Sequence, residues 1–243
     1  MSAFTRISRS DLQESIVSRL LNVYASKMKG REFVLDPDVP AGYLFFYLYR
    51  RLRMLVTGRL RFPFGKNVSV GKHVRILRKN LLLLGKSVVI GDYVYIDAMA
   101  HEGVRIGDYS SVGRNTRIEC TGSIAHMGRG MTVGAGAALG TDCYYGAAGG
   151  IAIGDHTIVG NFVSFHSENH VTSDLEVPIS FQGVTHTGIT VGSGCWLGAR
   201  VTILDGAVIG DGAIVAAGAV VVSGEYPGNC VYGGVPARKL SMR

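Results

Sequence analysis

Aliphatic side chains recur every six residues over much of the chain. The longest unbroken run comprises Val191, Leu197, Ile203, Ile209, Val215 and Val221. A period of six matches neither the 3.6-residue repeat of an amphipathic helix nor the two-residue alternation of a strand. It predicts a chain wound into flat triangular coils, in which each six-residue unit supplies one short strand, one corner and one inward-pointing side chain.

The same spacing recurs upstream in shorter blocks. They consist of Leu84, Ile90 and Ile96, then Ile106, Val112 and Ile118, then Val133 and Leu139, and finally Ile153, Val159 and Phe165. Each break in the frame indicates an insertion at a corner, and the longest insertion falls between Phe165 and Val191. Because one coil cannot bury its apolar edge alone, the coils must stack. Residues from about 67 to 222 therefore predict an all-β prism of seven or eight coils.

The repeat divides the chain into three predicted segments. Residues 1–65 lack it and predict a helical, basic segment, with one helix up to about residue 30 and another from about 41 to 57. Residues 66–223 form the predicted prism, which carries a long loop at residues 166–190. Residues 224–243 form a C-terminal extension, because prolines and paired glycines end the repeat.

Composition indicates a folded protein in a reducing compartment. Glycine contributes 34 of 243 residues, which the corners explain, and an apolar content of 47% argues against disorder. The four cysteines show no paired spacing, so we expect free thiols. The sequence shows neither the pattern of a signal peptide nor an apolar run long enough to span a membrane. We therefore expect a cytoplasmic protein.

Positive charge is concentrated in one region. From Ala41 to Ile90 there are eleven Lys and Arg residues and no Asp or Glu. One interpretation is a basic amphipathic helix that caps the open end of the prism. The other is a surface that contacts anionic lipid head groups, or a lipid-linked acceptor, at the inner face of the cytoplasmic membrane. No recognition motif accompanies the charge, so we do not expect nucleic acid binding.

Three short motifs accompany the repeats. They are FHSENH at residues 165–170, CWLG at 195–198 followed by VTILDG at 201–206, and GVPAR at 234–238. Together they resemble the hexapeptide-repeat acyltransferases, in the branch that contains maltose and galactoside O-acetyltransferases and the O-acetyltransferases of bacterial surface polysaccharides. The resemblance covers residues 130–240 strongly and 67–130 by the repeat alone. Residues 1–65 do not resemble the N-terminal segment of the maltose enzymes. The resemblance implies a left-handed parallel β-helix and a homotrimer that binds acetyl-CoA between neighbouring prisms.

Acyl transfer from a thioester to a hydroxyl needs a base for the proton and a donor for the developing oxyanion. A neutral imidazole serves as such a base, since the reference pKa of histidine is about 6.5. The resemblance implies that His170 is the catalytic histidine, with Glu168 or Asp174 orienting its ring. We expect a backbone N–H at a corner to stabilise the oxyanion. No Ser or Cys nucleophile motif indicates a covalent intermediate.

The resemblance also implies the residues that bind acetyl-CoA, which are Trp196, Ala199, Ala217 and Arg238. The alanines would line the pantetheine arm through backbone groups. The guanidinium would meet a phosphate of CoA. Residues 222–223 are Val-Ser where many relatives have Thr-Lys, and Lys239 is a candidate to replace the phosphate contact that this change removes.

Two further residues are implied in binding the saccharide acceptor. Asp142 lies about one coil before His170, and in relatives a polar residue near this place on the neighbouring chain contacts sugar hydroxyls. His166 belongs to the same motif as His170 and is expected in the wall of the site. The remaining histidines are expected on the surface of the coils or, for His186, late in the insertion.

The sequence thus predicts an acetyl-CoA-dependent O-acetyltransferase acting on a saccharide hydroxyl, with a bacterial surface polysaccharide or its precursor as the expected acceptor. N-acetyl transfer to an amino sugar, or acetylation of a xenobiotic, is the alternative. A metal hydratase of the γ-carbonic anhydrase type would use His166, His170 and His186 as zinc ligands. A non-catalytic scaffold on a degenerate repeat is a third possibility. The FHSENH motif and the single tryptophan favour the transferase, for which we expect no metal.

Overall fold

The computed structural model describes residues 21–23, 25–26, 32, 34–36, 38–62 and 67–243. The chain divides into two compact units, at Met1–Arg53 and Met54–Arg243. Most of the predicted first helix lies outside the described residues, although residues 21–23 and 25–26 are helical. Helix α2 covers Ala41–Arg61 and so ends four residues beyond the predicted boundary. Within the described residues, no helix combines the length and apolarity needed to cross a membrane.

Three parallel sheets make up most of the second unit. Sheet A contains β1 (Ser69–Val70), β4 (Val89–Ile90), β7 (Ser111–Val112), β10 (Ala138–Leu139), β13 (Ile158–Val159), β18 (Trp196–Leu197), β21 (Ile214–Val215), β24 (Cys230–Gly233) and the antiparallel β25 (Arg238–Met242). Sheet B contains β2 (Arg75–Leu77), β5 (Tyr95–Asp97), β8 (Arg117–Glu119), β11 (Tyr144–Gly146), β14 (Ser164–His166), β19 (Thr202–Leu204) and β22 (Val220–Val221). Sheet C contains β3 (Leu82–Leu84), β6 (Val104–Ile106), β9 (Met131–Val133), β12 (Ile151–Ile153), β17 (Ile189–Val191), β20 (Ala207–Ile209) and β23 (Gly224–Tyr226).

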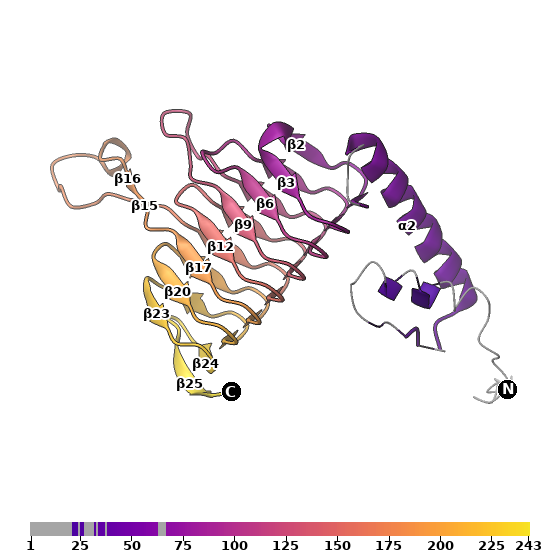
Figure 1. Cartoon of the computed structure of the whole chain (residues 1–243). Helices are drawn as coiled ribbons and strands as arrows, with labels where there is room; N and C mark the ends of the chain where they lie inside the picture. The colour runs from indigo at the N-terminus through magenta and orange to yellow at the C-terminus, as the bar shows by residue number, and fades with distance from the viewer. Residues whose placement is uncertain (1–20, 24, 27–31, 33, 37, 63–66) are drawn as a thin grey trace, which may run out of the picture. The chain divides into compact units, whose positions relative to one another are not determined.

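Successive strands visit the three sheets in turn, so that three strands complete one triangular coil. Each strand then pairs in register with the strand one coil away, as Phe165 pairs with Tyr145 and Ile203. Seven complete coils, from β1 to β23, are stacked along one axis, and β24 follows them (Figure 1). The predicted fold class, an all-β left-handed parallel β-helix with a helical N-terminal segment, is confirmed.

The core is the inner column of side chains that the six-residue period predicts. The residues from Ile90 to Val221 named in the repeats are buried, whereas Leu84, near the first coil, is half-buried. Tyr145 occupies the same column although the sequence analysis did not assign it there. Its ring stacks on Phe165 at 4.9 Å between centroids. Burial of these stacked side chains is the main source of stability for a coil that has no core of its own.

Glycine follows many inward residues because the corners stack very closely. A Cβ built on Gly198 would lie 2.5 Å from the backbone N of Ala217 in the next coil, closer than side chains pack in folded proteins. Several other corner positions adopt a left-handed backbone without being glycine. Asp142, with a φ of 57°, is one of them, and aspartate tolerates this conformation better than most residues.

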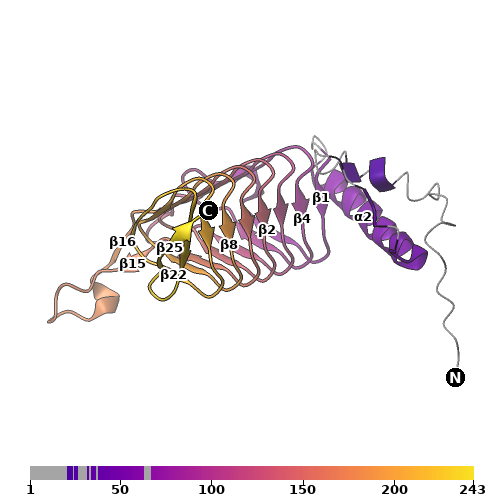
Figure 2. The same ribbon diagram turned by 90° about the horizontal axis from the view of Figure 1, so that it is seen from below.

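Two insertions leave the stack at the corner between sheets B and C. The first is a short hairpin at residues 121–128, between β8 and β9, closed by a bridge between Ser123 and His126. The second, residues 167–188 between β14 and β17, contains β15 (Asn169–His170), the 3-10 helix η2 (Ile179–Phe181) and β16 (Val184–Thr185). We call it the β15–β16 insertion. Figures 1 and 2 show it projecting well beyond the stack.

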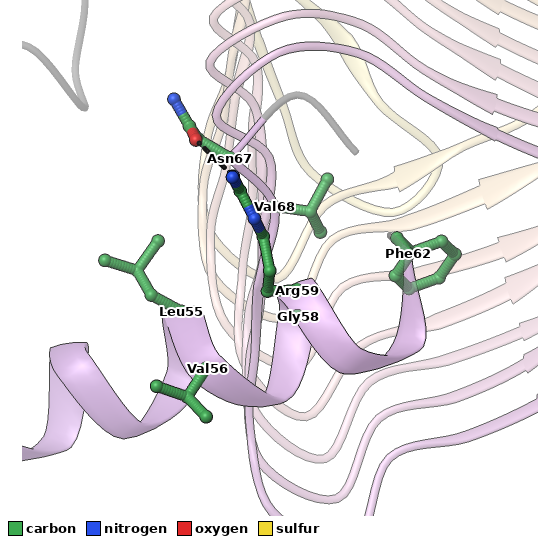
Figure 3. A pocket seen from close by; sticks show the side chains of 7 residues that line it. All are labelled: Leu55, Val56, Gly58, Arg59, Phe62, Asn67 and Val68. Atoms are coloured by element: carbon green, nitrogen blue, oxygen red, sulfur yellow. Dashed lines mark hydrogen bonds between the residues drawn. The ribbon is translucent and has the colours of Figure 1, made fainter. Parts of the chain in front are cut away.

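The last turns of α2 lie on the first coil within the second unit. A Cβ on Gly58 would lie 1.9 Å from the carbonyl oxygen of Val68, so this close approach requires glycine. The Arg61 guanidinium donates a 2.8 Å hydrogen bond to the carbonyl of Val74. A pocket of about 260 Å³ remains beside them, lined by residues that include Leu55, Phe62 and Val68 (Figure 3). This packing supports the interpretation that the end of the basic helix caps the prism.

A further 3-10 turn, η1 (Lys79–Leu81), belongs to the same coil.

Candidate active site

His170 lies in the two-stranded ladder at the base of the β15–β16 insertion. β15 and β16 are antiparallel, with His170 opposite Val184 and Asn169 opposite Thr185. The Val171 N–H donates a 3.1 Å hydrogen bond to the carbonyl of Gly183 and extends the pairing. The ladder therefore fixes the backbone of His170, while its side chain is exposed and open to another molecule.

A buried carboxylate holds both limbs of the insertion. Asp205, at the corner after β19, is only 3% exposed. It accepts hydrogen bonds from the N–H groups of Thr187 and Gly188 at 3.0 and 2.7 Å, and lies 3.5 Å from the side-chain amide of Asn169. Because Asn169 precedes His170 directly, the position of the predicted base is tied to a neighbouring coil. The sequence analysis missed this role of Asp205.

His166 ends β14 and its side chain contacts Tyr144 on the preceding coil. The two rings are 5.6 Å apart between centroids and tilted by 37°. Partial burial lowers the pKa of the His166 imidazole, because it disfavours the charged form. A weakly charged, partly covered ring fits the predicted place of His166 in the wall of a site.

Tyr144 continues a polar network over the outer face of sheet B. Its hydroxyl donates a 3.1 Å hydrogen bond to Glu119, whose other oxygen lies 2.5 Å from the Arg117 guanidinium. Burial raises the pKa of Tyr144, and the negative charges of Glu119 and Glu168 raise it further. The hydrogen bond to Glu119 raises the pKa of Arg117. Side chains alternate inward and outward along each sheet B strand, so the outward positions of Arg117, Glu119 and Tyr144 could have been predicted from the sequence.

Glu168, at the start of the β15–β16 insertion, lies near the hairpin at residues 121–128. A Cβ built on Gly122, in the hairpin at residues 121–128, would be 3.7 Å from Oε1 of Glu168. Its charge also acts on Tyr144. These contacts place Glu168 close to the polar network of sheet B, and its predicted support of the His170 ring stays a prediction.

Asp142 lies at a different corner of the coil, between sheets A and B. Its carboxylate accepts a 2.7 Å hydrogen bond from the side-chain amide of Asn115, one coil earlier. Within one chain, the fold therefore does not bring Asp142 next to His170. Contact with the acceptor through a neighbouring chain stays a prediction.

The four residues predicted to bind acetyl-CoA lie along sheet A and its corner with sheet B. Trp196 points outward from β18 and is 53% exposed. Ala199 and Ala217 occupy successive coils of the A–B corner, linked by a 2.9 Å hydrogen bond from the Gly218 N–H to the Ala199 carbonyl. Arg238 begins β25 at the edge of sheet A. The fold groups these four but separates them from the corner that carries His170.

A model of the bacterial transferase hexapeptide, comprising six repeats, matches residues 188–223. These residues run from β17 to β22 and contain the longest unbroken series of the six-residue repeat, from Val191 to Val221. The match thus covers the last coils of the stack. A relative from Mycobacterium tuberculosis, named a probable acetyltransferase, is 27% identical over 168 residues, or 69% of this chain and 52% of the relative. This chain thus spans about half the length of the curated relative it matches.

Solved structures show the same fold. AntD, an N-acyltransferase from Bacillus cereus crystallised with dTDP and 3-hydroxybutyryl-CoA, is 22% identical, with a TM-score of 0.51. That comparison covers 74% of this chain and 81% of AntD. A variant of AntD bound to dTDP-4-amino-4,6-dideoxyglucose and coenzyme A gives the same identity and TM-score, over 74% and 82% of the two chains. At this identity the likeness establishes the fold of this chain and no more.

A small cleft lies beside the return limb of the β15–β16 insertion. It has a volume of about 170 Å³ and includes Thr187 and Gly188 together with Glu102 and Arg129. The latter two form an ion pair at 3.2 Å. Among the described residues of one chain, no three His, Cys, Asp or Glu side chains are grouped as metal ligands, so the three histidines of the hydratase alternative do not converge there.

Proposed function

We propose that this protein is an acetyl-CoA-dependent O-acetyltransferase that acts on a saccharide hydroxyl, with a bacterial surface polysaccharide or its precursor as the acceptor. The observation that carries the proposal is the placement of His170. An exposed imidazole sits on a hydrogen-bonded ladder that the buried Asp205 ties to the coil stack. A base held in this way, yet open to a second molecule, suits proton removal from an incoming hydroxyl.

In the proposed reaction, neutral His170 takes the proton of the acceptor hydroxyl as its oxygen attacks the thioester carbonyl. A backbone N–H at a corner stabilises the oxyanion. When the tetrahedral intermediate collapses, the C–S bond breaks and the imidazolium returns its proton to the leaving CoA sulfur. Glu168 supports the transient positive charge. The acetyl group passes directly to the acceptor, so no covalent enzyme intermediate is needed.

The proposed CoA site fits the small and basic residues along sheet A. At the A–B corner, Gly198 and Gly218 flank Ala199 and Ala217, which leaves backbone groups accessible to a pantetheine arm. The exposed Arg238 offers a planar donor for a phosphate. Because this corner is not the one that carries His170, a complete site needs a second chain. We therefore propose a homotrimer, in which the β15–β16 insertion of one chain faces the A–B corner of its neighbour.

The decisive experiment is acetylation of a saccharide panel with acetyl-CoA, followed by thiol release and mass spectrometry. We expect His170→Ala to lower the rate by at least about a hundredfold, as loss of a general base does, while CoA binding and the oligomer stay intact. His101→Ala, a change of an exposed histidine on another coil, serves as the matched control. Wild-type rates in His170→Ala would refute the proposed base. Amino sugars in the panel test the alternative of N-acetyl transfer, and AntD, which shares the fold, is named an N-acyltransferase.

We also propose that the first turns of α2 contact an anionic membrane surface. Phe45, Tyr49 and Leu52 share one helical face and are 61–67% exposed. The helix has five arginines and no acidic residue, so its charge complements anionic lipid head groups. Co-sedimentation with phosphatidylglycerol vesicles is expected, and should weaken in phosphatidylcholine vesicles and in Leu52→Ser. Equal sedimentation with both lipids would contradict this contact.

A further inference from the structure

A strip of outward-facing polar and aromatic side chains runs along sheet B toward the insertion. It consists of Tyr95 on β5, Arg117 and Glu119 on β8, Tyr144 on β11 and His166 on β14. We call it the sheet B strip. The Arg117 guanidinium lies 5.0 Å from the centroid of the Tyr95 ring, and the contacts of Glu119, Tyr144 and His166 continue the series coil by coil.

The other two faces of the prism carry no such series between β4 and β20. Outward positions of sheet A there are Val89, Ser111, Ala138, Ile158 and Trp196, and those of sheet C are Arg105, Thr132, Ala152, Thr190 and Val208. Apart from Trp196 and Arg105, these positions hold small or aliphatic residues, which thus suffice on the outside of a coil. Stacking of the coils does not explain why four consecutive strands of sheet B present aromatic, guanidinium, carboxylate and imidazole groups in mutual contact.

The chemistry of the strip suits a sugar chain. The rings of Tyr95 and Tyr144 offer apolar faces for the C–H side of a pyranose, while their hydroxyls remain polar. Arg117 donates hydrogen bonds and Glu119 accepts them, which matches sugar hydroxyls that do both. Since the charges of Arg117 and Glu119 offset each other, the strip does not select a strongly anionic group such as a phosphate.

The extent of the strip indicates the size of its ligand. Four neighbouring strands cover about 15 Å at the spacing of paired strands, which is longer than one sugar ring. The strip ends at His166, directly before the insertion that carries His170. We infer that the strip binds successive units of an oligosaccharide or polysaccharide acceptor and leads the unit to be acetylated toward His170. This inference rests on the proposed function and specifies its acceptor as a chain rather than a single sugar.

The kinetic test compares acceptors of increasing length. De-O-acetylated oligosaccharides of one to four units, prepared from bacterial surface polysaccharides, serve as the series. For wild-type protein we expect kcat/KM to rise with length. Tyr144→Ala and Glu119→Gln should lower kcat/KM for the longer acceptors by about tenfold, the scale of one or two lost hydrogen bonds. The same variants should lower kcat/KM for the single sugar by a smaller factor than for the longer acceptors, and should leave the KM for acetyl-CoA unchanged. Arg105→Ala, on the outer face of sheet C, is the matched control.

A binding measurement separates the strip from the catalytic proposal. Saturation-transfer NMR with the four-unit oligosaccharides should give a signal for wild type and for His170→Ala but a much weaker one for Tyr144→Ala. Tyr144→Phe is the conservative variant, because it keeps the ring and removes only the hydroxyl. Thermal unfolding of Tyr144→Ala and Tyr144→Phe shows whether each variant is folded. Equal signals in wild type and Tyr144→Ala, or no signal with any oligosaccharide, would overturn the strip. If the strip binds while no saccharide is acetylated, the catalytic proposal fails and the strip stands.

Discussion

Asp205 holds Gly188 at the return end of the β15–β16 insertion, through a 2.7 Å hydrogen bond from the Gly188 N–H to its buried carboxylate. The link is reciprocal, because the Gly206 N–H donates a 2.9 Å hydrogen bond to the Gly188 carbonyl. The insertion is thus anchored in the coil that follows it. Since the same carboxylate lies near Asn169, the anchor acts on both limbs.

Asp205→Ala should loosen the insertion while leaving the coils folded. The change removes the charged acceptor of two part-buried hydrogen bonds, from the N–H groups of Thr187 and Gly188, and a hydrogen bond to a charged group contributes about 1.5–3 kcal/mol. We expect kcat to fall more than the KM for acetyl-CoA rises, because the CoA residues lie at another corner. Limited proteolysis should cleave within residues 171–183 faster than in wild type. Asp205→Asn keeps one acceptor oxygen and should recover part of the rate. An unchanged cleavage pattern would argue against the anchor.

Arg238→Ala should weaken binding of acetyl-CoA without changing the chemical step. Arg238 is exposed at the start of β25, and its guanidinium donates a 3.2 Å hydrogen bond to the neighbouring Ala237 carbonyl. Loss of a charge-assisted contact to phosphate should raise the KM for acetyl-CoA about tenfold. Acetyl-dephospho-CoA, which lacks the 3′-phosphate, tests the target of this contact. If Arg238 binds that phosphate, wild type and variant should use the shortened donor equally well. Lys239→Ala tests the other predicted phosphate partner.

Most of the prism could be predicted because its pattern is local. Every sixth residue from Val191 to Val221 is small and aliphatic, and all six are buried as expected. Tyr145 escaped the pattern since a tyrosine does not look like a core residue, although it sits in the same column. The end of α2 was predicted too early because packing of Gly58 and Arg61 on the first coil, which is not visible in the sequence, extends the helix.

The candidate site was only partly predictable, since its residues come from different coils. The motif predicted His170 at the start of an insertion, and the structure has it there, whereas His166 ends β14 directly before the insertion. Contacts such as Tyr144 with Glu119 join residues 25 positions apart. The six-residue repeat is interrupted at each corner insertion, so the sequence does not show which residues of neighbouring coils lie side by side. Asp205 looked like an ordinary turn residue in VTILDG. Its function as an anchor depends on where the insertion returns to the stack.

Tyr145→Phe should leave the stability unchanged or raise it by up to about 1 kcal/mol. Tyr145 is fully buried, and among described residues its hydroxyl has no hydrogen-bond partner. Burial raises its pKa well above the usual value, and the nearby Cys143 thiol raises it further. Phenylalanine keeps the stack on Phe165 and removes the polar group. Urea unfolding measures the difference, and Phe165→Ala, which should lose about 3–5 kcal/mol, calibrates the core. A loss above about 1 kcal/mol in Tyr145→Phe would show that the hydroxyl is satisfied.

His166 should make the folded state less stable as the solution is acidified. Burial lowers the pKa of His166 in the folded state below its unfolded value of about 6.5. In the range between the two values the unfolded chain binds more protons, so the free energy of unfolding rises with pH. The contribution of His166 is therefore fully present above about pH 6.5 and is lost as pH falls through the folded pKa.

The Tyr144 ring on β11 lies against the His166 ring, and Leu204 on β19 is the register partner of His166. Neither supplies a carboxylate at the ring, so burial stays the governing cause. Thermal unfolding of wild type and His166→Gln between pH 8 and pH 5 measures the effect. The melting temperature of His166→Gln should fall less on acidification, whereas the control His156→Gln, at an exposed corner, should follow wild type. Parallel curves for wild type and His166→Gln would mean that the imidazole is as easily protonated in the folded protein as in the unfolded chain.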